Sequence, residues 1–455
     1  MKILLVQPSA NPDAVVGDLQ LMEPLALEYL AAGLKDDHDV RVLDLRFDNN
    51  LESVLAEFGP NIVGTTGYTV HVKRCRDILK KVKEFKGNIV TIVGGHHATI
   101  SPQDFYEHDI DIVVRGEGVF ALKEIAEALE KKDNLKKIHG LVLQENGEFY
   151  PTKKRIHVDL DALPFPDRSC NPEHRKKYAL GTEKPIALLR TSLGCAFRCS
   201  YCAQWKISDG KYIIRNPSFI LEELSKIKEP YIFFADDETF LDVDGMKKLA
   251  GLIQEAGIKK KYHLFTRADT ITKHPNLIRE WKKIGLSYVT VGFEAFSNKE
   301  LEYLNKSASV DSNEMAIEIL RENKIVNYAN FIVRPDFDKI EFRRLRDYLR
   351  RKKLYNPKLP IFTPLPGTDY YDSVKSELTS DDYELYDFKH ALVPTKLPLK
   401  EFYKEYINLQ KNAVPRIHAY MELIKRPLAA AFSLFIKRKK SLAKMRKSYG
   451  LSEKQ

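Results

Sequence analysis

The sequence predicts an α/β protein with two successive series of alternating strands and helices, followed by a polar, helical C-terminal region. Three observations lead to this prediction. The 455 residues are too many for one ordinary hydrophobic core. Short runs of Ile, Val and Leu recur between amphipathic segments along residues 1–140, and they recur again along 186–375. Such uninterrupted apolar runs are typical of parallel strands that are buried on both faces.

Residues 1–140 are expected to form a doubly wound, Rossmann-like domain. The apolar runs are short, and the run near residue 90 ends at Gly94-Gly95. The predicted strands are 3–6, 40–45, 62–64, 89–93 and 112–114, and the predicted helices are 22–34, 75–85 and 121–130. Ligands of such a sheet bind beyond the carboxyl ends of its strands.

The rest of the chain is divided into three further parts. Residues 141–185 are expected to form a hairpin and a proline-containing linker, 186–375 a second βα domain, and 376–455 a helical, basic region. The strands of the second domain are predicted at 187–190, 232–235, 262–266, 288–293, 327–333 and 361–363. Six βα units make a partial (β/α)6 barrel of the TIM type. A barrel carries its chemistry at the carboxyl ends of its strands.

Three of the five Cys lie together in Cys195-Ala-Phe-Arg-Cys199-Ser-Tyr-Cys202, directly after the first strand of the barrel. Three thiolates in one tight loop can hold three irons of a [4Fe-4S] cubane and leave the fourth iron for a reacting ligand. A zinc knuckle is the alternative, but zinc sites need a fourth ligand, and no other Cys or His lies close in the sequence. So few Cys outside the motif indicate a reducing compartment.

This spacing, with the aromatic Tyr201 before the last Cys, resembles the radical S-adenosylmethionine (SAM) superfamily. The resemblance implies that the open iron chelates the amine and carboxylate of SAM. It also implies that further SAM contacts come from Tyr201, Asp236, Asp237, Arg267, Glu294 and Pro364. Two alternatives stay open: either Asp could be a helix N-cap, and Arg267 or Glu294 could belong to a buried ion pair. The fifth predicted strand ends at Val333-Arg334, where relatives often carry a Gly.

The N-terminal domain resembles cobalamin (B12)-binding domains. The likeness lies in the helix that begins Pro24-Leu-Ala-Leu-Glu, in the loop Gly94-Gly95-His96-His97 and in Gly116-Glu117-Gly118. Glycine at a strand end lets a ligand approach the backbone closely. The cobalamin contacts that this resemblance implies are Pro24, Thr66, Gly67, Gly94, Gly95, His96, Gly116, Glu117 and Gly118. The D-x-H-x-x-G motif is absent around His71, so we expect a cobalt without a His from that motif.

Charge and hydropathy suggest where the protein acts. The formal net charge is +10, and ten basic residues against one acidic residue, Glu422, lie between Arg416 and Lys447 around a short apolar stretch. This pattern favours peripheral contact with an anionic membrane through 416–447, or else a basic helix packed on the barrel. No signal peptide or span of ~20 apolar residues is recognised, which predicts a cytoplasmic protein, possibly at the inner membrane surface. No nucleic-acid-binding module is recognised.

Within the cobalamin-dependent radical SAM proteins, segments 227–233, 336–338 and 390–399 resemble the hopanoid C-3 methylase type. The resemblance implies methylation of an unactivated carbon of a hydrophobic, hopanoid- or isoprenoid-like lipid through a 5′-deoxyadenosyl radical and methylcobalamin. Its cofactors would be a [4Fe-4S] cluster, SAM and cobalamin, and its electron donor a flavodoxin or ferredoxin. Two alternatives remain: carbon–carbon coupling or ring formation on the same architecture, and a non-catalytic corrinoid or iron–sulfur protein.

Overall fold

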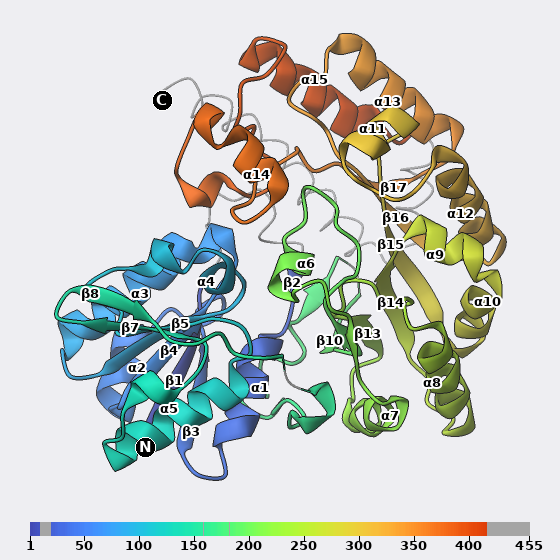
Figure 1. Ribbon diagram of the computed structural model, residues 1–455. Coiled ribbons are helices and arrows are strands. Elements are labelled where there is room, and N and C mark those ends of the chain that lie inside the picture. The colour runs from blue at the N-terminus through green and yellow to red at the C-terminus, as the bar shows by residue number, and fades with distance from the viewer. Residues whose placement is uncertain (10–19, 158, 182, 416–455) are drawn as a thin grey trace. The chain divides into compact units, whose positions relative to one another are not determined.

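The computed structural model describes residues 1–9, 20–157, 159–181 and 183–415. These residues form two compact units (Figure 1). The first is built mainly from Met22–Tyr178 together with the N-terminal strand and Lys206–Asp209, and the second mainly from Ala179–Trp205 and residues 210–415. Each unit contains a series of parallel strands, which confirms the predicted α/β class.

The first unit is built on a seven-stranded sheet in the order β3-β1-β4-β5-β6-β7-β8. The five strands from β3 to β6 run parallel, whereas β7 and β8 pair antiparallel at one edge. The strands are β1 (Lys2–Gln7), β3 (Asp39–Asp44), β4 (Ile62–Thr66), β5 (Val90–Gly94), β6 (Ile112–Val114), β7 (Leu141–Glu145) and β8 (Glu148–Pro151). The helices are α1 (Leu25–Leu34), α2 (Leu51–Phe58), α3 (Val72–Phe85), α4 (His96–Ile100) and α5 (Val119–Lys131). The predicted hairpin therefore extends this sheet.

The strand order places a topological switch point at one place on the sheet edge. The chain passes from β1 to β3 on one side and then to β4 on the other, so the direction of winding reverses between β1 and β4. The carboxyl ends of these two strands are Gln7 and Thr66. In doubly wound sheets, ligands bind beyond the strand ends at such a switch point.

The second unit is built on a six-stranded, fully parallel sheet in the order β10-β13-β14-β15-β16-β17. The strands are β10 (Ile186–Leu189), β13 (Tyr231–Phe234), β14 (Lys261–Thr266), β15 (Leu286–Glu294), β16 (Val326–Phe331) and β17 (Asn356–Lys358). The main helices are α7 (Pro217–Lys226), α8 (Val243–Glu255), α9 (Ala268–Lys273), α10 (Pro275–Ile284), α11 (Asn298–Tyr303), α12 (Val310–Glu322) and α13 (Lys339–Arg351). Helices such as α8, α10 and α12 cover its outer face (Figure 1). This is the partial (β/α)6 barrel that the sequence predicts.

An aromatic core holds the barrel sheet to its helices. The indole of Trp281 on α10 is fully buried, and its ring centroid lies 5.5 Å from those of Phe234 and Tyr262. Val289 and Val291 of β15 belong to the same core. Because side chains alternate across a strand, Tyr288 and Thr290 face the interior of the barrel instead.

The last strand lies earlier in the sequence than predicted. The prediction placed it at 361–363, but β17 ends at Lys358, and Ile361 forms only an isolated parallel bridge to Val333. The apolar run Ile361-Phe362 misled the prediction because Pro360 and Pro364 enclose it and cannot donate to a ladder. Beyond it lie α14 (Asp369–Val374) and α15 (Leu399–Asn412). The basic stretch predicted at 416–447 lies outside the described residues.

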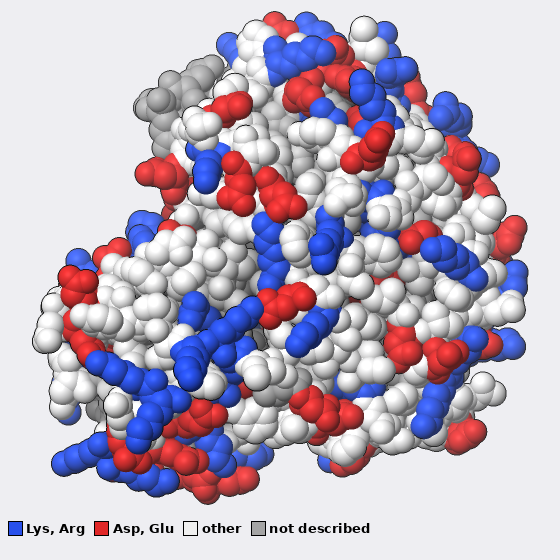
Figure 2. Space-filling model, viewed as in Figure 1, with Lys and Arg blue, Asp and Glu red and all other residues white. Residues whose placement is uncertain are grey.

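Figure 2 shows acidic and basic side chains interspersed over the viewed face. A patch of one sign therefore does not dominate the part of the surface that is seen there. Among the described residues, no helix is both long enough and apolar enough to cross a bilayer.

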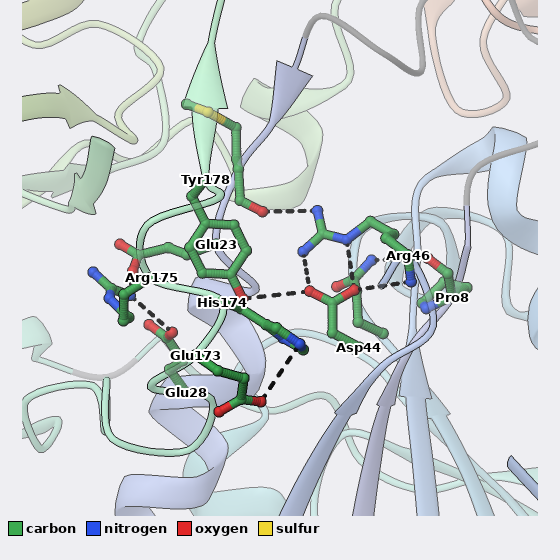
Figure 3. A network of polar contacts seen from close by, with 11 residues as sticks. Pro8, Glu23, Glu28, Asp44, Arg46, Glu173, His174, Arg175 and Tyr178 are labelled. Atoms are coloured by element: carbon green, nitrogen blue, oxygen red, sulfur yellow. Dashed lines mark hydrogen bonds and ion pairs between the residues drawn. The ribbon is translucent and has the colours of Figure 1, made fainter. Parts of the chain in front are cut away.

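Buried ion pairs hold the segment after the hairpin on the first unit (Figure 3). Arg175 pairs with Glu23 and lies 3.3 Å from Glu28, which stands in the first turn of α1. Arg46 holds Asp44, at the end of β3, through contacts of 2.8 and 2.6 Å. Burial, and then the charge of Glu23, raise the pKa of Glu28 well above its usual value. The Tyr178 hydroxyl donates to Asp44 at 3.4 Å, which ties the linker to the edge of the sheet where β3 ends.

Candidate functional site

The three motif cysteines follow β10 in one loop. The side chain of Cys199 is buried, and those of Cys195 and Cys202 are partly exposed. Burial, and then the neighbouring Cys199 thiol, raise the pKa of Cys202 to about 12. No three His, Cys, Asp or Glu side chains of the described chain converge on a point that could hold a single metal ion. In a cubane each thiolate binds a different iron, so three separate thiols in one loop fit a cluster.

Backbone contacts fix the shape of the loop Cys195–Cys202, which we call the cluster loop. The N–H of Ser200 donates to the carbonyl of Leu304 (3.1 Å), and the carbonyl of Ser200 accepts from the N–H of Tyr370 (2.9 Å). The side-chain amide of Asn305 donates to the carbonyl of Arg198 (2.6 Å). The loop is therefore held from the segments after β15 and β17, which lie far from it in the sequence.

Asp236 and Asp237 follow β13, and both bind the strand that leads into the cluster loop. Asp236 Oδ1 accepts from the N–H groups of Thr191 (2.7 Å) and Ser192 (3.0 Å). Asp237 accepts from the N–H of Gly194 (3.0 Å) and from the side chain of Gln204 (2.5 Å). Neither Asp caps a helix: α8 begins later and is capped by Asp242. Burial raises the pKa of Asp236 to about 6.

Glu238 is a site residue that sequence reasoning missed. Its side chain is 1% exposed and accepts from the Thr266 hydroxyl at 2.6 Å. Burial raises its pKa to about 7, although that hydrogen bond and the charge of Arg267 oppose the shift. Its position in the run Asp236-Asp237-Glu238 could have identified it from the sequence, because all three residues follow a barrel strand.

Glu294 ends β15 in a buried ion pair. Its carboxylate lies 3.5 Å from Nζ of Lys306, another residue that the sequence analysis did not single out. Lys306 also donates to the Tyr201 hydroxyl (3.5 Å), so the ion pair is connected to the residue before Cys202. A Cβ on Gly292 would lie 2.2 Å from Glu294 Oε1, so a side chain there would displace this carboxylate. Glu294 thus lies in a buried ion pair, and its predicted contact with SAM stays a prediction.

Arg267 directly follows β14, and Pro364 lies in the segment beyond the end of β17. Arg267 follows β14, is 6% exposed, and pairs with Asp269 at 2.8 Å. Pro364 is buried in the loop after Ile361, where Thr368 caps α14. All the residues predicted to bind SAM thus gather at the carboxyl ends of the barrel strands.

The predicted cobalamin residues gather at the carboxyl edge of the first sheet. Thr66 ends β4 at the switch point and Gly67 follows it, while Gly94 ends β5 and Gly95 follows it. Gly95 has a φ of +97°, and a Cβ there would lie 2.2 Å from the Thr66 hydroxyl. The two loops can pack against each other only because this residue lacks a side chain.

The remaining predicted residues lie at helix starts on the same edge. Pro24 precedes α1, and His96 begins α4, with its ring centroid 5.1 Å from that of Tyr68. Gly116, Glu117 and Gly118 precede α5, where the Glu117 carboxylate accepts from the N–H of Phe120 at 3.1 Å. An edge that carries glycines beyond β4, β5 and β6, next to the switch point and with the Tyr68 side chain 62% exposed, fits a large planar cofactor.

His71 lies beside this edge. Its Nδ1 accepts from the N–H of Tyr68 at 3.2 Å. Burial, and then the positive charges of Arg46 and Arg74, lower its pKa to about 4. The imidazole is therefore neutral at physiological pH.

Two family models match the two units separately. Residues 15–126 match the B12 binding domain, and residues 189–349 match the radical SAM superfamily. The chain is 32% identical to a hopanoid C-3 methylase of Methylococcus capsulatus, over 90% of this chain and 80% of that protein. It is 27% identical to an anaerobic magnesium-protoporphyrin IX monomethyl ester cyclase of Cereibacter sphaeroides, over 87% and 67%.

The solved structures agree with this architecture. The cobalamin-dependent SAM radical enzyme OxsB, with aqua-cobalamin and SAM bound, superposes with a TM-score of 0.75 over 97% of this chain and 71% of that chain. The sequence identity is only 17%, so this likeness concerns the fold.

Proposed function

This chain belongs to the family of cobalamin-binding radical SAM proteins, and from that membership we propose that it methylates an unactivated carbon of a hydrophobic, hopanoid- or isoprenoid-like lipid. The chain is a cobalamin-dependent radical SAM methyltransferase. Its cofactors are a [4Fe-4S] cluster, SAM and cobalamin. The substrate and the individual residue roles are the proposal.

The cofactors supply an electron, a carbon-centred radical and a transferable methyl group. In the proposal, Cys195, Cys199 and Cys202 hold the cluster, and Asp236 and Asp237 fix the backbone that leads into its loop. The Lys306–Glu294 pair lies beside Tyr201 and would orient the carboxylate and amine of SAM through opposite charges. The glycine-rich edge of the first sheet would hold cobalamin. The buried setting keeps water away from the reacting groups.

The single observation that carries the lipid substrate is the 32% identity to the hopanoid C-3 methylase over 90% of this chain. The surroundings of the cluster loop support it. Tyr201 and Tyr303 each lie 6.4 Å, between ring centroids, from Phe362, which stacks on Tyr370 at 3.7 Å. Phe362 and Tyr370 are buried and Tyr303 is 53% exposed, so this aromatic cluster reaches the surface at Tyr303.

Ring formation is the second candidate, and the likeness to the magnesium-protoporphyrin cyclase favours it. Both reactions begin with removal of a hydrogen atom, so the architecture alone does not separate them. The mass of the product does: methylation adds one methylene, whereas ring closure removes two hydrogens.

The test compares lipid extracts of cells that carry the gene with extracts of cells that lack it, by mass spectrometry. We expect a lipid that is heavier by one methylene only in the first set. Cells with the Cys199→Ala variant are the control and should match the cells without the gene, while Cys75→Ala, a fully buried cysteine of the first unit, should match the wild type. An unchanged lipid profile, with active protein present, contradicts the lipid substrate.

The reductant is also part of the proposal. Enzymes of this family need an external electron donor, and we propose a flavodoxin or ferredoxin for that role. Purified protein with such a donor and SAM should form 5′-deoxyadenosine, whereas the Cys199→Ala variant should not. The predicted membrane contact through 416–447 stays a prediction because those residues lie outside the described chain.

A further inference from the structure

Arg267 lies directly on the cluster loop. Its guanidinium carbon is 3.6 Å from the ring centroid of Phe197, which stands between Cys195 and Cys199. This is a close stacking contact for a cation on an aromatic face. Arg267 comes from the end of β14, so a barrel strand places a permanent positive charge on the loop that carries the cluster ligands.

The charge is held in place by the other contacts of the same side chain. Arg267 Nε donates to Asp269 Oδ1 at 2.8 Å, and Nη2 donates to the carbonyl of Ser307 at 2.9 Å. Nη1 lies 4.0 Å from Cys199 Sγ, at the long end for a hydrogen bond to sulfur. The guanidinium plane is thus fixed on three sides, and its free rotation is lost.

The thiol that it faces is the most buried of the three. Cys199 is 6% exposed and Arg267 is also 6% exposed, so water screens their interaction weakly. Reduction adds one negative charge to an iron–sulfur cluster. A fixed cation beside one of its sulfur ligands stabilises the reduced state more than the oxidised state. Charges and hydrogen bonds at the sulfurs are known to set the potentials of such clusters.

We propose that Arg267 sets the reduction potential of the cluster, with Phe197 as the platform that holds its charge beside Cys199. Arg267 acts here as a positioning residue for charge and ligates no iron. This role goes beyond the proposed function, because it concerns the cluster and is independent of the substrate. Each Nη of Arg267 keeps an N–H that the described contacts do not use. The same side chain can therefore contact SAM and also act on the cluster.

The test is the midpoint potential of the full-length protein, loaded anaerobically with iron and sulfide and titrated without SAM, cobalamin or lipid. The reduced cluster is followed by EPR. Omitting SAM separates the effect on the cluster from any effect on SAM binding. We expect Arg267→Gln to lower the equilibrium constant for one-electron reduction at least tenfold, which corresponds to about 59 mV more negative. Arg267→Lys keeps a charge without the planar fork and should give a smaller shift of the same sign.

The matched control is Arg279→Gln, on α10. It removes one positive charge from the same unit, where Arg279 contacts Asn276, and should leave the potential unchanged. An Arg267→Gln protein with full iron content and the wild-type potential overturns the proposal, as does an equal shift in Arg279→Gln. If the Arg267→Gln protein holds no cluster, the potential of Arg267→Lys is the deciding measurement. An Arg267→Lys potential equal to that of the wild type then overturns the proposal.

Discussion

The Asp236 side chain offers the sharpest test of how the cluster loop is held. One oxygen, Oδ1, accepts from two backbone N–H groups, those of Thr191 and Ser192. The other oxygen accepts from the Thr191 hydroxyl at 2.5 Å. Asp236→Asn keeps Oδ1, and its amide can donate to the same hydroxyl. Asp236→Ala removes every acceptor and leaves both backbone donors buried.

The magnitudes follow from the charge and from the orphaned donors. Burial raises the pKa of Asp236 from 3.8 to about 6, and keeping the group ionised in the folded state therefore costs about 3 kcal/mol above pH 6. Asp236→Asn removes that cost and should stabilise the second unit by up to about 3 kcal/mol at pH 8. Because the native pKa is raised, the wild type loses stability as pH rises from 3.8 to 6, so about half of the gain should remain at pH 5.

Asp236→Ala should be less stable than Asp236→Asn by about 2–6 kcal/mol, since each orphaned N–H costs about 1–3 kcal/mol. Urea unfolding followed by tryptophan fluorescence measures this difference, because Trp205 and Trp281 are the only two tryptophans and both belong to the second unit. Equal stability of the Ala and Asn variants would refute the anchoring role. Equal stability of Asp236→Asn and the wild type at pH 8 would refute the claim that the buried charge of Asp236 destabilises the folded protein.

Three further changes probe other buried charges. Burial raises the pKa of Glu238 from 4.5 to about 7. Glu238→Gln should therefore stabilise the second unit by about 3 kcal/mol at pH 8 and flatten the fall in stability between pH 5 and 8. Urea unfolding followed by tryptophan fluorescence measures both effects. Lys306→Met leaves Glu294 buried without its partner and should cost about 3–5 kcal/mol, whereas adding Glu294→Met should recover most of that loss in the same assay. Arg175→Met removes one of the two arginines that pair with Glu23 in the first unit and leaves Arg168, 3.6 Å from Glu23, as its partner; we expect a loss of about 1.5–3 kcal/mol in the far-ultraviolet circular dichroism transition, with the tryptophan transition unchanged.

Each of these three expectations can fail independently. A Glu238→Gln protein whose stability still falls with pH as steeply as the wild type contradicts the first. A double variant no more stable than Lys306→Met contradicts the second, because the loss would then come from packing and not from a stranded charge. A fall in the tryptophan transition of Arg175→Met contradicts the third, because it would mean that the network supports both units.

The nature of the site could be predicted from local sequence because each motif is a short, contiguous set of chemical groups. Three thiols within eight residues are a recognisable ligand set for a cubane, and glycines after strands leave the backbone open to a ligand. The strands that carry these loops are also local features, since runs of Val, Ile and Leu bury themselves on both faces of a parallel sheet. The sixth barrel strand was misplaced because the apolar run at Ile361-Phe362 lies between two prolines.

By itself, the sequence determined the two-part α/β architecture, the cluster loop and the glycine-rich edge. Only the tertiary structure decided which charges meet there: Lys306 at Glu294, Asp236 at the strand entering the loop, and Arg267 on Phe197. These partners lie 12, 45 and 70 residues apart in the chain. Long-range pairs of this kind depend on how barrel strands bring their carboxyl ends to one edge, and no local pattern records that geometry.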